Sequence, residues 1–367
     1  MARSNNAIEV NNAENVTIHN NSISNVLDAD KLSGYADATI NMPGYGIGVS
    51  NSTGVMLSGN DISLFESAIF AQYASNISID ANNIRNNNYG IKYGFGVANT
   101  HIINNEISEQ IGLYTMDVPE GPSGYGIFLN NSAVNVTINH NHIYANHLGI
   151  SIDSNYSTGI VITQNIITDN VLEGIRFNAG YDLAEDAVEP HVTDNAIYRN
   201  ARGPSMMILG ELSANPFGIY GNGLYNPEDR LKLEPNWYGT NNLQTWDNDT
   251  GVVGYGTMCP RINTTNIPFN MTYNSAGNYS IKFYKNGVLA SNLPVFDMFA
   301  TLNRGTDKET EIVFDVIDGV GTFTFDASSF NATGNTIEIS IGSLINSMSR
   351  VFKVAYQYNV PQSEIPV

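Results

Sequence analysis

The sequence predicts an all-β chain that consists of a right-handed parallel β-helix followed by an immunoglobulin-like (Ig-like) β-sandwich. Three observations support this prediction. Short strands with a period of two recur through the first two-thirds of the chain. An Asn-x-apolar phrase returns at intervals as short as 22 to 24 residues, which is the length of one coil. From about residue 257 the pattern changes to alternating strands joined by tight turns.

The composition suits a folded core with many turns. Hydrophobic residues make up 42% of the chain and charged residues only 14%, below the usual fraction of about 25%. Asn, Ser, Thr and Gly supply most of the polarity and favour turns over helices. The net charge of −19 argues against nucleic acid or an anionic membrane surface as a partner, because both attract Lys and Arg. The single cysteine, Cys259, excludes an intrachain disulfide.

The stretch NVTINHNHIYANHLGISI at 135–152 contains one whole coil of the predicted β-helix. A β-branched pair is followed by an Asn corner, an isoleucine and a Gly-apolar strand. The Asn phrase begins at eight positions: Asn21, Asn60, Asn82, Asn105, Asn141, Asn165, Asn195 and Asn222. Coils stacked about 4.8 Å apart should align like residues in columns. We therefore expect an internal ladder of Ile84, Ile107, Ile143, Ile167 and Ile197, with stacked Asn amides at the turns. A second Asn column is expected at Asn87, Asn146, Asn170 and Asn200.

Three segments interrupt the period. Leu27–Gly44 and Glu109–Gly124 both precede a Gly-apolar strand, so they should project from the same face of the β-helix. A smaller insertion, Tyr181–Pro190, lies at a different corner. Insertions at one coil position often build a binding face.

The predicted β-helix with its end cap covers residues 1–240. The segment NPEDRLKLEPNWYGTNN at 226–242 should cover the last open coil and begin the exit from it. Residues 241–256 are expected to be a linker, and residues 257–367 to form the Ig-like β-sandwich. Within that sandwich, Asn286-Gly287 should be the turn of a hairpin.

A candidate binding surface follows from the strand register. If the isoleucines of the Gly-apolar strands point inward, the residue after each must point outward. This outward column contains Gly48, Phe70, Lys92, Phe128, Ser151 and Arg176. Aromatic rings with interspersed polar groups suit sugars or peptides, and the insertions add Tyr35 and Tyr114. The candidate ligand-binding residues are therefore Phe70, Lys92, Phe128, Arg176, Tyr35 and Tyr114. The alternative is that the insertions merely cover Phe70 and Phe128.

Metal binding has weaker support in the sequence. The candidates are Asp28, Asp30 and Asp117 in the insertions, where Asp28-Ala29-Asp30 has the alternation of a Ca²⁺ loop without its full motif. We therefore expect no cofactor and leave Ca²⁺ open. The three histidines His140, His142 and His147 lack a Cys or carboxylate to complete a zinc site, so surface imidazoles that bond to turns are expected.

Catalysis is likewise not expected. A glycosidase needs two carboxylates that converge at a defined separation, whereas Asp80, Asp153 and Asp169 fall on different parts of the coil. A polysaccharide lyase or glycoside hydrolase remains the alternative, because such enzymes often use a β-helix.

The Asn-rich coils followed by NWYGTNN (236–242) and an Ig-like module resemble the adhesin-like surface proteins of methanogenic archaea. In that family a β-helix leads into Ig-like repeats, and NWWGTN-type segments mark the join; here Tyr238 replaces the second Trp. The resemblance implies a cell-surface adhesin that is extracellular, binds glycans or surface proteins of other cells, and has no defined catalytic residues. No secretory signal or long apolar run is present, so we expect a fragment of a longer protein without direct membrane insertion. A purely structural stalk is a further alternative.

Overall fold

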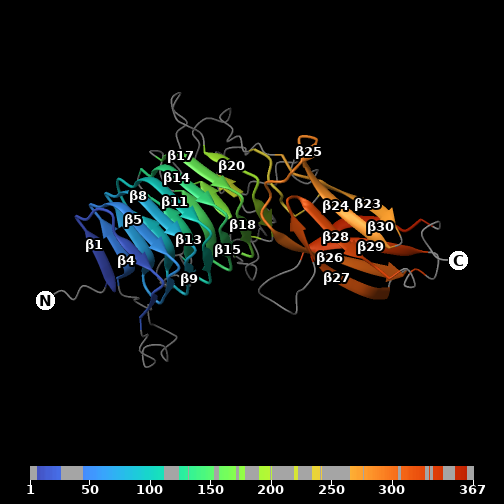
Figure 1. Ribbon diagram of the computed structural model, residues 1–367, viewed down its shortest axis with the longest axis horizontal. Coiled ribbons are helices and arrows are strands. Elements are labelled where there is room, and N and C mark those ends of the chain that lie inside the picture. The colour runs from blue at the N-terminus through green and yellow to red at the C-terminus, as the bar shows by residue number, and fades with distance from the viewer. Residues whose placement is uncertain are drawn as a thin grey trace, which may run out of the picture.

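The computed structural model describes residues 6–25, 44–110, 124–130, 132–152, 157–170, 173–177, 190–198, 200, 219–221, 234–239, 241, 265–275, 277–304, 307–326, 330, 334–341 and 352–361. All elements within these ranges are β-strands. The first part winds into a right-handed β-helix and the second is an antiparallel sheet (Figure 1). Among the described residues, no helix is long and apolar enough to cross a membrane.

Three parallel sheets form the walls of the β-helix, and each coil contributes one strand to each sheet. Sheet A contains β1 (Ile8–Asn11), β4 (Tyr45–Ser50), β7 (Ser67–Gln72), β10 (Tyr89–Tyr93), β13 (Tyr125–Leu129), β16 (Leu148–Ile152), β19 (Ile175–Phe177) and β22 (Ile219–Gly221). Sheet B contains β2 (Thr17–His19), β5 (Thr53–Ser58), β8 (Ser75–Asp80), β11 (Ala98–Ile103), β14 (Val134–Asn139), β17 (Thr158–Thr163) and β20 (His191–Thr193). Sheet C contains β3 (Ser22–Ser24), β6 (Asp61–Ser63), β9 (Asn83–Arg85), β12 (Glu106–Ser108), β15 (His142–Tyr144), β18 (Ile166–Thr168) and β21 (Ala196–Tyr198).

The predicted isoleucine ladder is confirmed in sheet C. Register pairs join Ile84, Ile107, Ile143, Ile167 and Ile197 in sequence, and all five side chains are fully buried. Burying each is worth about 1.5–3 kcal/mol. These side chains form much of the β-helix core.

The first Asn column is a continuous chain of amide hydrogen bonds along the β-helix. The side-chain nitrogen of Asn82 donates to Oδ1 of Asn105 (3.0 Å), and Oδ1 of Asn82 accepts from the backbone N–H of Asn60 (2.9 Å). The predicted eighth member, Asn222, lies outside the described residues. The column continues from Asn195 to Asn236, because Oδ1 of Asn236 accepts from the backbone N–H of Asn195 at 3.0 Å. The eighth member of the column is therefore Asn236, and the prediction of Asn222 at that position is wrong.

The second Asn column is also confirmed and has one further member. Asn146 donates to Oδ1 of Asn170 (3.1 Å), and Asn170 donates to Oδ1 of Asn200 (2.9 Å). Between Asn87 and Asn146 the column passes through Gln110, whose Oε1 accepts from the backbone N–H of Asn87 (2.9 Å). The longer glutamine side chain fills the same place, which a search for asparagine alone misses.

The second part of the chain is an antiparallel domain. Its strands are β23 (Phe269–Ser275), β24 (Asn278–Lys285), β25 (Val288–Leu289), β26 (Phe296–Arg304), β27 (Asp307–Ile317), β28 (Val320–Thr324), β29 (Asn335–Ile341) and β30 (Phe352–Asn359). The predicted hairpin at Asn286-Gly287 is confirmed, and both residues have positive φ. Positive φ at both central residues is typical of a tight hairpin turn.

The predicted all-β fold class is confirmed, with one refinement in this domain. The strands follow a single order, β23-β24-β28-β27-β26-β29-β30, where a sandwich would have two separate sheets. The short β27–β28 hairpin keeps the two halves hydrogen-bonded while the sheet curls. Tyr279 of β24 therefore contacts Tyr358 of β30, near the other end of the order, with ring centroids 6.0 Å apart.

The NWYG segment joins the two parts through the alternation of its side chains. Tyr238 points into the β-helix core, whereas Trp237 belongs to the core of the second domain. The Trp237 ring lies 5.0 Å from Phe283 and 5.8 Å from Phe269, measured between centroids. Asn236 also pairs with Asn266 through an isolated parallel β-bridge, which links the segment to the start of the second domain. One short segment therefore closes the first core and begins the second.

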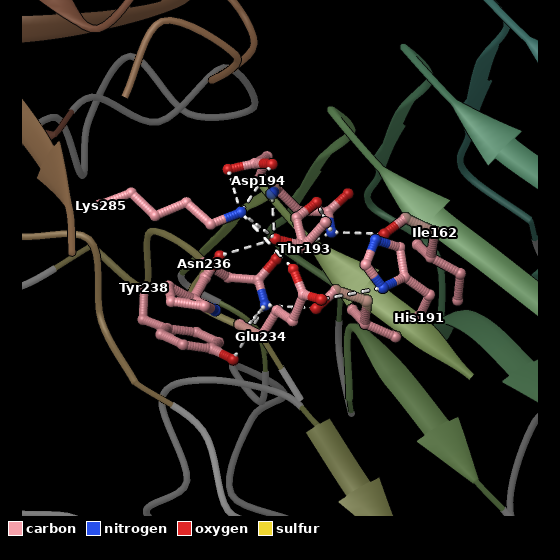
Figure 2. Close-up of polar contacts among 11 residues, drawn as sticks. Ile162, His191, Thr193, Asp194, Glu234, Asn236, Tyr238 and Lys285 are labelled. Atoms are coloured by element: carbon pink, nitrogen blue, oxygen red, sulfur yellow. Dashed lines mark hydrogen bonds and ion pairs between the residues drawn. The ribbon is translucent and has the colours of Figure 1, made fainter. Parts of the chain in front are cut away.

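A polar cluster strengthens this junction (Figure 2). The Lys285 ammonium of β24 lies 2.9 Å from Asp194 and donates to Oγ1 of Thr193 at 2.6 Å. Glu234 lies 3.7 Å from the same nitrogen and 3.2 Å from Nδ1 of His191. Apart from Asn241, the predicted linker at 241–256 lies outside the described residues. The boundaries at 240 and 257 remain predictions.

Candidate functional site

The outward column of sheet A has the predicted register. Gly48 pairs with Phe70, Phe70 with Lys92, and Lys92 with Phe128; the column continues through Ser151 and Arg176. A side-by-side arrangement of two phenylalanines and two bases therefore exists as expected. Its role in binding remains a prediction.

Three tyrosines that the sequence reasoning missed form a second column beside the first. Tyr45 stacks on Phe70 with ring centroids 4.3 Å apart, and Tyr89 stacks on Tyr125 at 5.4 Å. Phe128 packs at 4.9 Å from Tyr125 and 5.5 Å from Tyr89. The signal was present in the sequence, because each tyrosine precedes the glycine of a Tyr-Gly-Ile strand.

Close approach of neighbouring coils explains those glycines. A Cβ on Gly90 would lie 2.5 Å from the carbonyl oxygen of Gly126, and a Cβ on Gly126 would lie 2.5 Å from that of Gly149. No other residue fits without displacing the next coil. Tyr89 and Tyr125 are consequently held one coil apart where sheet A begins, and Tyr45 lies two coils before Tyr89, with Ser67 between them.

The two bases of the outward column are ion-paired rather than free cations. Lys92 Nζ lies 2.8 Å from Oε1 of Glu66 and 4.1 Å from the centroid of the Tyr89 ring. Arg176 lies 2.6 Å from Glu173 on the same coil. The sequence reasoning did not include these carboxylates. The face therefore offers paired charges and aromatic rings, with little net charge of its own.

Burial also raises the pKa of the Tyr45 hydroxyl, and the Glu66 carboxylate adds to the effect. Tyr45 therefore stays protonated well above neutral pH and can donate a hydrogen bond. A phenol, an ammonium and a carboxylate thus converge around Phe70.

Exposure differs along the outward column. Phe128 is only 9% exposed and Ser151 is fully buried, whereas Phe70, Lys92 and Arg176 are partly exposed. Phe128 is therefore buried, and the rings of Tyr89 and Tyr125 on its own face pack against it. The alternative that the insertions cover it concerns residues outside the described ranges. Tyr35, Tyr114 and most of both insertions lie outside the described residues. The accessible candidates among those described are Phe70, Lys92 and Arg176.

The proposed metal ligands Asp28, Asp30 and Asp117 also lie outside the described residues. Within the described part of the chain, no group of three or more His, Cys, Asp or Glu side chains could hold a metal ion. Calcium binding by the insertions stays a prediction.

The three histidines do not form one cluster of surface imidazoles. His142 stacks on Tyr144, with ring centroids 4.3 Å apart. His147 is mostly buried, and this burial, with the positive charge of Arg176, lowers its pKa to about 4. His147 is therefore only partly exposed, and its backbone N–H donates to the carbonyl oxygen of Gly124 at 3.0 Å.

The carboxylates considered for catalysis have structural partners. Asp80 accepts a hydrogen bond from Nδ2 of Asn104 (3.0 Å), and Asp169 accepts one from Oγ1 of Thr168 (2.7 Å). Asp153 lies outside the described residues. The absence of catalysis remains a prediction.

These features define the class of a right-handed parallel β-helix with an attached antiparallel β domain. A family model described as "Right handed beta helix region" matches residues 6–197. The chain belongs to this family. No curated protein matches the chain.

Two tailspike structures are among those similar to the chain. The Dettilon tailspike protein (gp208) is 12% identical over 81% of this chain and 68% of its own, with a TM-score of 0.25. Tailspike protein 2 of the Escherichia coli O157:H7 bacteriophage CAB120 is 10% identical over 87% of this chain, with a TM-score of 0.23. The chain spans about half of the second protein, 54%. At these values, neither similarity informs the function of this chain.

Proposed function

We propose that the chain is an extracellular, cell-surface binding protein that recognises glycans or surface proteins of other cells through sheet A. It is a non-enzymatic adhesin, in keeping with the resemblance to adhesin-like surface proteins of methanogenic archaea. The observation that carries the proposal is that the tyrosine column lies beside the outward column of sheet A around Phe70. There, an aromatic stack lies beside the Lys92–Glu66 ion pair on one wall of a rigid coil.

The chemistry of this surface suits a hydroxyl-rich ligand. Aromatic rings offer a flat apolar surface at low conformational cost, and sugar rings present matching C–H faces. Charged groups that are already paired make strong hydrogen bonds to hydroxyls without adding net charge to the bound state. Tyr45 donates from the edge of the same stack. A scaffold of buried Ile and Asn columns holds these groups in place, which lowers the ordering cost of binding.

A binding experiment with two variants tests the proposal. The whole chain is applied to an array of glycans and cell-wall fragments, with and without Ca²⁺. Phe70→Ala and Lys92→Met should each weaken the binding found by about tenfold, which corresponds to about 1.4 kcal/mol. Phe128 is unsuitable as a probe, because its replacement would open a cavity. Met56→Ala on sheet B, an exposed side chain of a different face, is the matched control.

Unchanged binding by both variants would refute the role of this face. A chain that binds no glycan, peptide or cell would instead behave as a structural stalk. Binding without cleavage is expected, since Asp80 at the end of β8 and Asp169 after β18 belong to different sheets of the coil and a glycosidase needs two converging carboxylates. Reducing ends or unsaturated products released from a polysaccharide panel would establish the alternative of a lyase or glycoside hydrolase.

A further inference from the structure

Two exposed aromatic side chains lie at the corner between sheets A and B. Tyr73 follows β7 and is 58% exposed, and Phe95 follows β10 and is 55% exposed. The backbone N–H of Tyr73 donates to the carbonyl oxygen of Phe95 at 2.7 Å. The backbones of the two residues therefore lie at the same corner on successive coils, which are about 4.8 Å apart along the axis.

Tyr73 has a backbone conformation that disfavours a tyrosine. Its φ is +48°, in the left-handed region. In the two preceding coils the same corner is held by Asn12 (φ 52°) and Asn51 (φ 48°). Asparagine tolerates this region, whereas a bulky side chain adopts it at a cost in free energy.

This cost is not recovered by burying the ring, because the side chain stays largely in solvent. Stability alone would favour asparagine here, as in the earlier coils. Strain that persists at an exposed position without a packing benefit indicates a functional constraint.

Glycines keep the space around the corner open. A Cβ on Gly96 would lie 3.1 Å from Cδ1 of Tyr73, and a Cβ on Gly94 would lie 3.3 Å from Cζ of Phe70. Because Gly94 and Gly96 have no side chains, part of the Tyr73 ring and part of the Phe70 ring stay uncovered. Phe70 is three residues before Tyr73, a distance of about 10 Å along the chain. The corner thus extends the aromatic surface of sheet A.

The neighbouring polar groups are neutral. Gln72 donates to Oγ of Ser50 at 3.4 Å, and Asn51 occupies the same corner in the preceding coil. Amides and hydroxyls bond to sugar hydroxyls without selecting a charge. The net charge of −19 disfavours polyanionic ligands. These features fit a neutral polysaccharide better than an acidic one.

We propose that Tyr73 and Phe95 form a second glycan subsite, on which the rings of a neutral polysaccharide pack as it crosses from sheet A to the corner. This inference rests on the proposed function for the class of ligand, but it concerns different residues. The subsite would lengthen the footprint of the ligand from one wall of the coil to two.

The test compares Tyr73→Asn and Phe95→Ala with Phe70→Ala in the whole chain. Affinities are measured by calorimetry for cello-, xylo- and manno-oligosaccharides of increasing length, with polygalacturonate as the acidic comparison. Tyr73→Asn restores the residue of the earlier coils, so it should raise the thermal midpoint of unfolding. It should also weaken binding of long neutral oligosaccharides about tenfold, and short ones less. Met56→Ala should change neither quantity.

Three outcomes would overturn the inference. One is wild-type affinity in both Tyr73→Asn and Phe95→Ala, and another is a lower thermal midpoint in Tyr73→Asn, which would make Tyr73 a structural residue. The third is tighter binding of polygalacturonate than of any neutral chain. If only Phe70→Ala weakens binding, the proposed function is supported and the second subsite is refuted. If only Tyr73→Asn and Phe95→Ala weaken binding, the proposed binding role of Phe70 on sheet A is refuted.

Discussion

Replacing Asn82 with alanine tests whether the amide columns, in addition to the apolar core, hold the coils together. Asn82 is buried, and its side-chain nitrogen donates to the carbonyl oxygens of Leu57 (2.9 Å) and Asp80 (3.1 Å). Its Oδ1 also accepts from the backbone N–H of Asn60 at 2.9 Å. Alanine removes all of these bonds. It introduces no backbone strain, because Asn82 is not among the residues with positive φ.

One buried backbone group, the N–H of Asn60, loses its partner in Asn82→Ala, whereas the carbonyl of Leu57 stays within the β5–β8 ladder. A buried group left unsatisfied costs about 1–3 kcal/mol. The variant should therefore lose about 1–3 kcal/mol of unfolding free energy. Urea titration followed by circular dichroism measures the loss, and hydrogen exchange at Asn60 shows whether it is local.

The adjacent residue provides the matched control. Asn83 is the next position along the chain, only partly buried, with one side-chain bond to Asp61 at 3.3 Å. Asn83→Ala should cost less than about 1 kcal/mol. If Asn82→Ala were no more destabilising than Asn83→Ala, the amide column would be incidental to stability, and the reasoning about stacked Asn residues would fail.

Three further changes address the glycine corners, the junction and the pH dependence of stability. Gly126→Ala places a Cβ 2.5 Å from a carbonyl oxygen of the next coil, so it should cost about 1–3 kcal/mol in urea titration. Lys285→Met leaves the mostly buried Asp194 without its ion pair; a loss of about 1–3 kcal/mol is expected, with greater interdomain flexibility in small-angle scattering. His147 has a folded pKa of about 4, below its ordinary 6.5. The unfolded state therefore binds more protons between these values, and stability falls as the pH drops through that window. His147→Gln should flatten this part of the stability profile, whereas an unaltered profile would contradict the assignment.

The β-helix could be predicted in detail because its physical constraints are local and repeated. Each coil must bury its apolar residues against identical neighbours, so an isoleucine at one position predicts the isoleucine above it. The register of Ile84, Ile107 and Ile143 follows from spacing alone. The prediction failed where an unexpected residue supplies the side-chain oxygen that accepts from the backbone N–H of the preceding coil. Gln110 replaces an asparagine in the second column, and Asn236 takes the place assigned to Asn222.

The candidate site could be predicted only in part. The outward direction of Phe70 and Lys92 follows from the alternation of strands, and the structure has that register. Phe128 packs against Tyr125 of its own strand and against Tyr89 of the neighbouring strand β10, and the second contact cannot be read from a single strand. The pairing of Lys92 with Glu66 likewise joins residues on different coils. Such contacts need the lateral spacing of the coils as well as their period.

The NWYG segment shows why the end of the β-helix and the start of the second domain should be considered together. A solenoid must cover its last coil, and here Tyr238 extends the internal column while Trp237 enters the next core. The same backbone continues the Asn column at Asn236 and pairs with Asn266. The cap is therefore the first contact of the second domain. Because Lys285 adds a charged bond at this point, the sheet A face should keep a fixed direction relative to the domain that follows.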